Sequence, residues 1–303
     1  MTAIAGPSRR GPGHRRSRRH GPARRATSPR AALAVLLTYL SLVLASAVVV
    51  VPLLAIVLTS LRTSGEMAAN GNPLSPPDDW FNLHNYKVAF TDGAMLQALG
   101  NTAFILVFSL LGTVLIGSMT AYAVDRFRFR GRRLVLTLFL VAALVPGVTT
   151  QVATYQVVNQ LGVMNTHWAP ILLYMGTDIV SIYIFLQFIR SIPTSLDEAA
   201  RIDGASPLTI YWRVILPLLK PAIATVVIVK GVAIYNDFYI PFLYMPSAEL
   251  GTISTSLFRF KGPFGAHWEV VAAGAALVIL PSLVVFLTLQ RFIYSGLTRG
   301  SGR

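Results

Sequence analysis

The chain has 303 residues, a formal net charge of +14 and a mean hydropathy of +0.60. Hydrophobic residues make up 54% of it and charged residues only 13%, about half the charged share of an average soluble domain. This composition predicts an all-α integral membrane protein rather than a soluble enzyme. The chain contains no cysteine, which excludes disulfides, thiolate metal sites and cysteine nucleophiles.

Positive charge is concentrated near the N-terminus, where nine arginines lie within residues 9–30. Because this segment is rich in Arg, Gly, Pro and Ser, we predict a disordered basic cytoplasmic tail over residues 1–30 and a membrane domain over 31–303. A cleaved signal peptide is the alternative, since Ala45-Ser46-Ala47 resembles a cleavage site. The apolar run continues to Leu61, however, which is too long for a signal peptide.

Six apolar runs are long enough to cross a bilayer, which requires about 20 residues each. They lie near residues 33–60, 99–124, 134–157, 168–189, 222–245 and 270–293, and Pro146 and Pro241 interrupt the third and fifth. With the N-terminus inside, the inner segments hold 21 of the 26 Lys and Arg residues and the outer loops hold four. We therefore predict six transmembrane helices with both termini in the cytoplasm. The basic charge is then a topology signal, and no nucleic-acid partner is expected.

The polar stretch 198–221 falls on the cytoplasmic side, between the fourth and fifth spans. Ser195 followed by Glu198 is a capping box, so a short helix is predicted to begin at Ser195 and to end at Gly204. Ser206 and Pro207 predict the start of a second helix. Its expected apolar face consists of Leu208, Tyr211, Trp212 and Ile215, and Pro217 and Pro221 are expected to end or kink it.

Polar residues within the apolar runs are the candidates for a transport pathway. The segment from Tyr235 to Phe242 combines amide, carboxylate and aromatic groups with a helix break, so Tyr235, Asn236, Asp237 and Tyr239 are candidate pathway residues. The alternative is that these rings form an interfacial belt and pack neighbouring spans.

Three ionisable residues, Asp178, Lys230 and Asp237, also fall within the predicted spans. They predict either an ion relay, as in a self-contained secondary transporter, or a structural ion pair such as Asp178 with Lys230. A third hypothesis is a membrane protein with a structural or assembly role that transports no substrate.

Motifs for catalysis are absent from the sequence. There is no glycine-rich phosphate loop, no HExxH and no GxSxG, and the five histidines are scattered. We therefore expect no enzymatic activity, no metal and no cofactor, and any ATP hydrolysis must reside in another chain.

The stretch Glu198-Ala199-Ala200, with Gly204 and Val214-x-Leu216-Pro217 after it, resembles the EAA loop of ABC-importer permease subunits. The longer form EAARIDGAS resembles the carbohydrate-uptake branch, in particular the second permease of maltose-type systems. Asn101-Thr102, Asn236-Asp237-Phe238 and Gly296-Leu297-Thr298 support the resemblance, which covers the chain from about residue 33.

This resemblance implies a permease subunit in the plasma membrane of a prokaryote. It implies that residues 198–221 form a pair of coupling helices that contact an ATPase through Glu198, Ala199, Ala200, Asp203, Gly204 and Pro217. The implied partners are a second, different permease subunit, two ATP-binding subunits and an extracytoplasmic sugar-binding protein. The implied substrate is a mono- or oligosaccharide, with a disaccharide or an amino sugar among the candidates.

Overall fold

The computed structural model describes residues 29–176, 178–262 and 265–300, and most of these residues are helical. The longer helices are α1 (Pro29–Leu61), α4 (Met95–Arg126), α5 (Arg132–Leu144), α6 (Gly147–Gln160), α7 (Trp168–Gly176), α8 (Ile179–Ser191), α12 (Lys220–Asn236) and α15 (Trp268–Gly300). The shorter ones are α2 (Ser64–Ala69), α3 (His84–Thr91), α9 (Ser195–Ile202), α10 (Pro207–Ile210), α11 (Leu216–Leu218), α13 (Tyr239–Tyr244) and α14 (Ile253–Ser256). A π-helix, η1 (Tyr211–Ile215), two 3₁₀ turns, η2 (Ala248–Leu250) and η3 (Leu257–Phe260), and the antiparallel pair β1 (Lys261–Gly262) and β2 (Gly265–Ala266) complete the list.

The chain divides into two units, Met1–Pro52 and Leu53–Arg303. In the first unit the structure describes the apolar N-terminal part of α1, whose described side chains from Leu33 onward are all exposed. The basic tail was predicted over residues 1–30, and residues 1–28 of it lie outside the described ranges. Pro29 and Arg30 already belong to α1.

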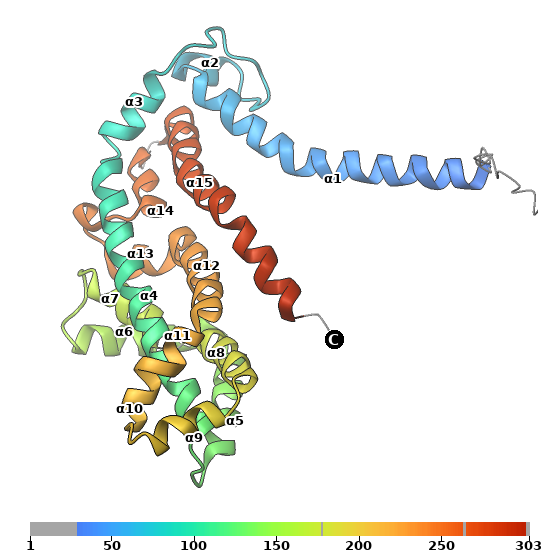
Figure 1. Cartoon of the computed structure of the whole chain (residues 1–303). Coiled ribbons are helices and arrows are strands. Elements are labelled where there is room, and N and C mark those ends of the chain that lie inside the picture. The colour runs from blue at the N-terminus through green and yellow to red at the C-terminus, as the bar shows by residue number, and fades with distance from the viewer. Residues whose placement is uncertain (1–28, 177, 263–264, 301–303) are drawn as a thin grey trace, which may run out of the picture. The chain divides into compact units, whose positions relative to one another are not determined.

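Helix α4 is the centre of the second unit, and it packs mainly against α7, α8 and α12. One apolar core joins α4 and α8 to the segment η1–α12 through residues that include Ala121, Phe185, Ile189, Ile215 and Val226. A second core joins α4, α7 and α12. In Figure 1, α9 and α10 lie at one end of α4, and α2 and α3 lie at the other.

The end of the second unit near α2 and α3 is folded around the buried side chain of Arg62. Its guanidinium donates to the carbonyls of Glu66, Asn70 and Asn72 at 2.6, 2.5 and 3.0 Å. The Glu66 carboxylate accepts from the backbone N–H groups of Thr63 and Asp78, and these hydrogen bonds lower its pKa. The segment between α1 and α3 is thus a fixed structure rather than an open loop.

The apolar runs appear as helices, several of them broken. The third run bends by 103° between α5 and α6, at Pro146 as expected. The fourth bends by 44° between α7 and α8, which the sequence analysis did not predict. By length and composition, two described helices could cross a membrane, or five if each bent pair counts as one span, so the six-span prediction is neither confirmed nor contradicted.

The break in the fifth run was predicted at Pro241, and its position was wrong. The helix ends at Asn236, and Pro241 lies in the first turn of α13 instead. Proline is tolerated there because the first N–H groups of a helix have no partner within the helix. The break therefore precedes the proline by four residues.

Close contact between α4 and α8 depends on the small residue Gly117. A Cβ atom at this position would lie 3.2 Å from the ring of Phe185, which is completely buried. Small residues let helix backbones approach closely, which is the usual basis of helix packing within membranes.

We predict that Gly117→Leu destabilises the protein, because the added side chain must displace buried Phe185. Overpacking of this kind costs about 1–3 kcal/mol. Gly100→Leu is the matched control, since it changes the same helix at a site with nothing within 4 Å. The free energy of unfolding, measured in mixed detergent micelles, should fall for the first variant only; an equal fall in both would contradict this account of the packing.

Candidate functional site

Two short helices, α9 and α10, meet at a tight corner formed by Asp203 and Gly204. Gly204 ends α9 in the left-handed conformation, with φ +80°, as predicted from its sequence position. Ser206 then caps α10 by accepting from the backbone N–H of Thr209 at 3.2 Å, and Pro207 occupies the first turn. The two-helix corner therefore has the local structure that the sequence predicted.

The predicted capping box at Ser195 was wrong. The residue that precedes α9 is Thr194, which is itself in a helical conformation and makes no side-chain cap. The chain enters α9 through a turn in which the N–H of Leu196 bonds to the carbonyl of Pro193 at 3.3 Å. Ser195 is therefore already inside the helix, and Glu198 is not needed to cap it.

The predicted apolar face of the second helix was only half right. Tyr211 and Ile215 are buried, but Leu208 and Trp212 are exposed, and buried Ile210 was missed. The reason is the π-helix over Tyr211–Ile215, in which hydrogen bonds connect residues five apart rather than four. This brings Ile210 and Ile215, five positions apart, into the same core.

A buried network of charges attaches α9 to the end of α4. The Asp197 carboxylate accepts from the Tyr122 hydroxyl at 3.2 Å and lies 3.2 Å from Nε of Arg126. The side chains of Arg126 and Asp197 are only 6% and 4% exposed. The same guanidinium donates to the carbonyls of Ile189 and Ile192, at the end of α8. One arginine thus connects α4, α8 and α9.

A second contact fixes the start of the π-helix. The hydroxyls of Tyr211 and Ser118 are 2.7 Å apart, and the rings of Tyr211 and Tyr122 have their centroids 5.7 Å apart. Hydrogen bonds to α4 therefore come from α9, before the corner, and from the π-helix that follows α10.

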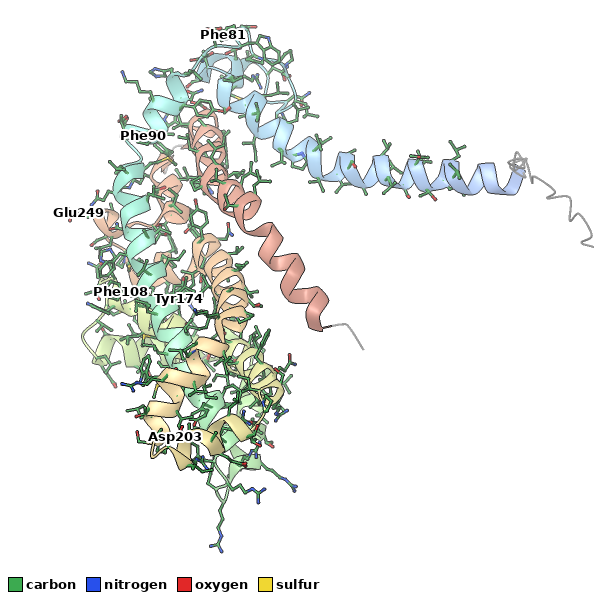
Figure 2. The ribbon with its side chains drawn as sticks, in the orientation of Figure 1. Phe81, Phe90, Phe108, Tyr174, Asp203 and Glu249 are labelled. Carbon is green, nitrogen blue, oxygen red and sulfur yellow. The ribbon has the colours of Figure 1, made fainter. Side chains whose placement is uncertain are left out.

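The predicted coupling residues lie on the opposite, exposed side of the corner. Glu198, Ala199, Asp203, Gly204 and Pro217 are exposed, and Ala200 is half-buried. Figure 2 shows Asp203 at the end of the second unit that is remote from Phe81. The outer surface of the corner thus mixes polar residues such as Glu198 and Asp203 with exposed apolar ones such as Ile202, while its inner surface is anchored.

Sequence reasoning missed the anchoring residues Ser118, Tyr122, Arg126 and Asp197. The only available signal was the pair Asp197-Glu198, in which two neighbouring carboxylates must face different directions on a helix. Arg126 was interpreted as a topology charge only.

Asp237, a predicted pathway residue, is occupied by structural hydrogen bonds. Its carboxylate accepts from the Tyr174 hydroxyl at 2.9 Å and from the backbone N–H groups of Tyr239 and Ile240 at 2.8 and 3.2 Å. Pro241 has no N–H to offer the carbonyl of Asp237, and the Ser254 hydroxyl donates to this carbonyl instead, at 2.7 Å. The helix break is thus satisfied within the protein, as non-helical backbone at membrane depth requires.

The other three pathway candidates differ in how free their side chains are. The Tyr235 hydroxyl donates to the carbonyl of Val278 in α15 at 2.9 Å. Asn236 and Tyr239 are exposed, and the Asn236 amide donates only to Val232 of its own helix. Asn236 and Tyr239 are therefore the candidates that remain available to a ligand.

The ionisable residues within the helices do not form a relay. Lys230 pairs with Asp178 at 3.1 Å, as the structural hypothesis predicted, and Asp178 also accepts from Ser181. Asp237 is engaged with Tyr174, on a different part of the bundle. Among the described residues, no group of three or more His, Asp or Glu side chains is placed to hold a metal ion.

Residues 113–299 match the family model described as "Binding-protein-dependent transport system inner membrane component". The matched range includes α9, the corner, the π-helix and α12.

Several curated proteins are similar over most of their length. The galactooligosaccharides transport system permease protein GanQ of Bacillus subtilis (strain 168) is 36% identical, over 88% of this chain and 94% of its own. The melibiose/raffinose/stachyose import permease protein MelC and the maltodextrin transport system permease protein MdxG of the same organism are 31% and 32% identical. They cover 83% and 87% of this chain, and 90% and 94% of their own.

Among solved structures, a chain of a bacterial ABC transporter involved in the import of the acidic polysaccharide alginate has the same fold. The TM-score is 0.74, with 21% identity over 87% of this chain and 98% of that one.

We predict that the two neighbouring carboxylates of α9, Asp197 and Glu198, differ in how much they contribute to stability. Asp197→Ala leaves Asp125 as the carboxylate that still faces buried Arg126 and removes the acceptor of the Tyr122 hydroxyl, which should cost about 1–3 kcal/mol of unfolding free energy. Glu198→Ala is the matched control: this side chain is exposed, so the change should stay within about 0.5 kcal/mol. Unfolding in mixed micelles measures both.

The double variant Arg126→Met/Asp197→Leu removes both charges together and should recover most of the loss from Asp197→Ala. If Asp197→Ala is no less stable than Glu198→Ala, the buried pair does not anchor α9.

Proposed function

The chain belongs to the family of binding-protein-dependent transport system inner membrane components, and we propose that it is one permease subunit of an ATP-driven sugar importer. The observation that carries the proposal is the corner at Gly204, which is anchored on one side by Arg126 and Asp197 and exposes both charged and apolar residues, among them Asp203 and Ile202, on the other. Such a rigid, projecting surface suits a contact that transmits force between subunits. A separate ATP-binding subunit is its proposed partner.

In this proposal the chain crosses the plasma membrane of a prokaryote six times, with both termini and the corner in the cytoplasm. The distribution of Lys and Arg supports this orientation. The bent helix pairs then count as single spans, and α15 supplies a further one. The basic tail, residues 1–30, is proposed to be a solvated cytoplasmic segment.

The proposed assembly contains a second, different permease subunit, two ATP-binding subunits and an extracytoplasmic sugar-binding protein. The exposed apolar side chains of α1 support a partner or lipid around that helix. Glu198, Ala199, Ala200, Asp203, Gly204 and Pro217 are the proposed ATPase-coupling residues.

The proposed substrate is an oligosaccharide, because the similar permeases are named for galactooligosaccharides, raffinose-type sugars and maltodextrin. Asn236 and Tyr239 are the proposed contacts in the pathway. Tyr235 and Asp237 are proposed to support these contact residues without touching the sugar, since hydrogen bonds to Val278 and Tyr174 hold their side chains.

Gly204→Val tests the coupling role of the corner. A β-branched residue is strained at φ +80°, by roughly 1–2 kcal/mol, although nothing lies within 4 Å of the position. We expect the tagged wild-type chain to copurify from gently solubilised native membranes with a second permease and an ATP-binding subunit, and the variant to lose the ATP-binding subunit.

Gly162→Val is the matched control for this experiment. Gly162 also has a positive φ, of +69°, and open space around it, but it lies in the loop between α6 and α7. The Gly162→Val variant should carry the same backbone strain and still copurify with the ATP-binding subunit. Recovery of the wild-type chain alone, from membranes in which another complex survives, would contradict the proposed assembly as a whole.

A second prediction separates contact residues from supporting ones in the pathway. Asn236→Ala should lower uptake severalfold without lowering stability, because the exposed amide makes only a local hydrogen bond. Asp237→Ala should lower stability by about 1–3 kcal/mol, because it leaves the first N–H groups of α13 and the Tyr174 hydroxyl without their acceptor.

Uptake of raffinose, maltotriose and a galactooligosaccharide by cells expressing each variant, together with unfolding in micelles, measures both effects. Unchanged uptake of a transported sugar by Asn236→Ala would remove this residue from the pathway.

A further inference from the structure

The turn between α4 and α5 carries far more positive charge than its surroundings neutralise. Residues 125–133, which we call the arginine turn, have the sequence DRFRFRGRR, with five arginines and one carboxylate. Gly131, with φ +92°, reverses the chain direction and starts α5. The turn lies beside the corner, since Arg126 joins it to α9.

The single carboxylate of the arginine turn is already shared. Asp125 lies 3.2 Å from Arg126, 3.5 Å from Arg132 and 3.6 Å from Arg190. Arg126 is additionally committed to Asp197. The remaining arginines of the turn, Arg128, Arg130 and Arg133, are exposed and form no ion pair with any residue that the structure describes.

These arginines surround a shallow recess of about 600 Å³, whose lining is Arg128, Phe129, Arg130, Gly131, Arg132 and Arg133. The recess lies at the first turn of α5, where Gly131 provides no side-chain cap for the helix N–H groups. Guanidinium forks are donors suited to phosphate oxygens, and the N-terminus of a helix favours an anion. The recess therefore has the chemistry of a phosphate site.

The residues between and after the arginines indicate where this phosphate comes from. Phe127 and Phe129, 38% and 43% exposed, alternate with the arginines. Helix α5 then exposes Leu134 and Leu138 directly after the turn, at 62% and 55%. Positive charge that borders an exposed apolar helix matches the boundary between lipid headgroups and hydrocarbon.

We propose that the arginine turn binds the phosphate of an anionic phospholipid. Arg128, Arg130 and Arg133 donate to the phosphate oxygens, and Phe127 and Phe129 pack against the glycerol and upper acyl region. An acidic protein surface would match the charge, but it would not explain the phenylalanines that alternate with the arginines. The bound lipid holds the turn that continues into the Arg126 anchor of α9.

The test uses the full chain in a neutral detergent. Binding of dioctanoyl phosphatidylglycerol, dioctanoyl phosphatidylcholine and inorganic phosphate is measured by microscale thermophoresis. We expect the anionic lipid to bind at least about tenfold more tightly than the zwitterionic lipid, and inorganic phosphate to bind more weakly than either, because it lacks the apolar part.

Charge-removing variants locate the site. R130Q should weaken binding of phosphatidylglycerol by roughly fivefold, and R128Q/R130Q/R133Q by about a hundredfold, which removes the preference over phosphatidylcholine. R213Q is the matched control, because Arg213 is an exposed arginine of the neighbouring π-helix with no ion pair among the described residues. It should bind both lipids as the wild type does.

The variant R128K/R130K/R133K guards against loss of folding or of orientation, since it keeps every positive charge. It should elute and melt like the wild type but bind phosphatidylglycerol several-fold more weakly, because lysine cannot form the bidentate fork. The proposal is overturned if the triple glutamine variant binds phosphatidylglycerol like the wild type. This holds even if the variant no longer copurifies with another protein, because the arginines would then serve a protein contact instead of a lipid. It is also overturned if inorganic phosphate binds as tightly as the lipid, which would indicate a free anion as ligand.

Discussion

The buried pair between Arg126 and Asp197 is the interaction on which the rest of the corner depends. Removing two charges from water is costly, and such a pair is retained only where hydrogen bonds satisfy the remaining donors and acceptors. Here Tyr122 and the last carbonyls of α8 supply them. The pair is therefore a positional constraint, because these groups meet only when the ends of α4 and α8 and the start of α9 lie together.

The same requirement explains the breaks in the apolar helices. The break before α13 is tolerated because the Asp237 carboxylate and the Ser254 hydroxyl satisfy backbone groups that it exposes, and the Tyr174 hydroxyl donates to the same carboxylate. The break between α7 and α8 falls at Asp178, which Lys230 of α12 neutralises. Polar residues within these apolar segments therefore serve first to make irregular backbone possible, and only exposed ones such as Asn236 remain for a ligand.

Features that depend on one residue and its immediate neighbours could be predicted from the sequence. The positive φ of Gly204, the cap at Ser206 and the bend at Pro146 follow from local chemistry. Features that depend on distant partners could not. Asp197 and Glu198 are adjacent and chemically similar, and only the position of Arg126, 71 residues earlier in the chain, separates the buried one from the exposed one. The ion pair of Asp178 likewise requires Lys230, 52 residues later in the chain.

The π-helix over Tyr211–Ile215 has a consequence for the length of this segment. A π-helix accommodates one more residue in its turn than an α-helix does, so the five residues Tyr211–Ile215 span nearly the same angle as one α-helical turn. Deleting one of them would let the segment relax into an α-helix while the residues on either side keep nearly their present directions. A deletion in the α-helical turn before it, Pro207–Ile210, has no such compensation and would rotate everything before it by about 100° about the helix axis. The π-helix is therefore the place in this segment where the chain can lose a residue and still present the corner in the same direction.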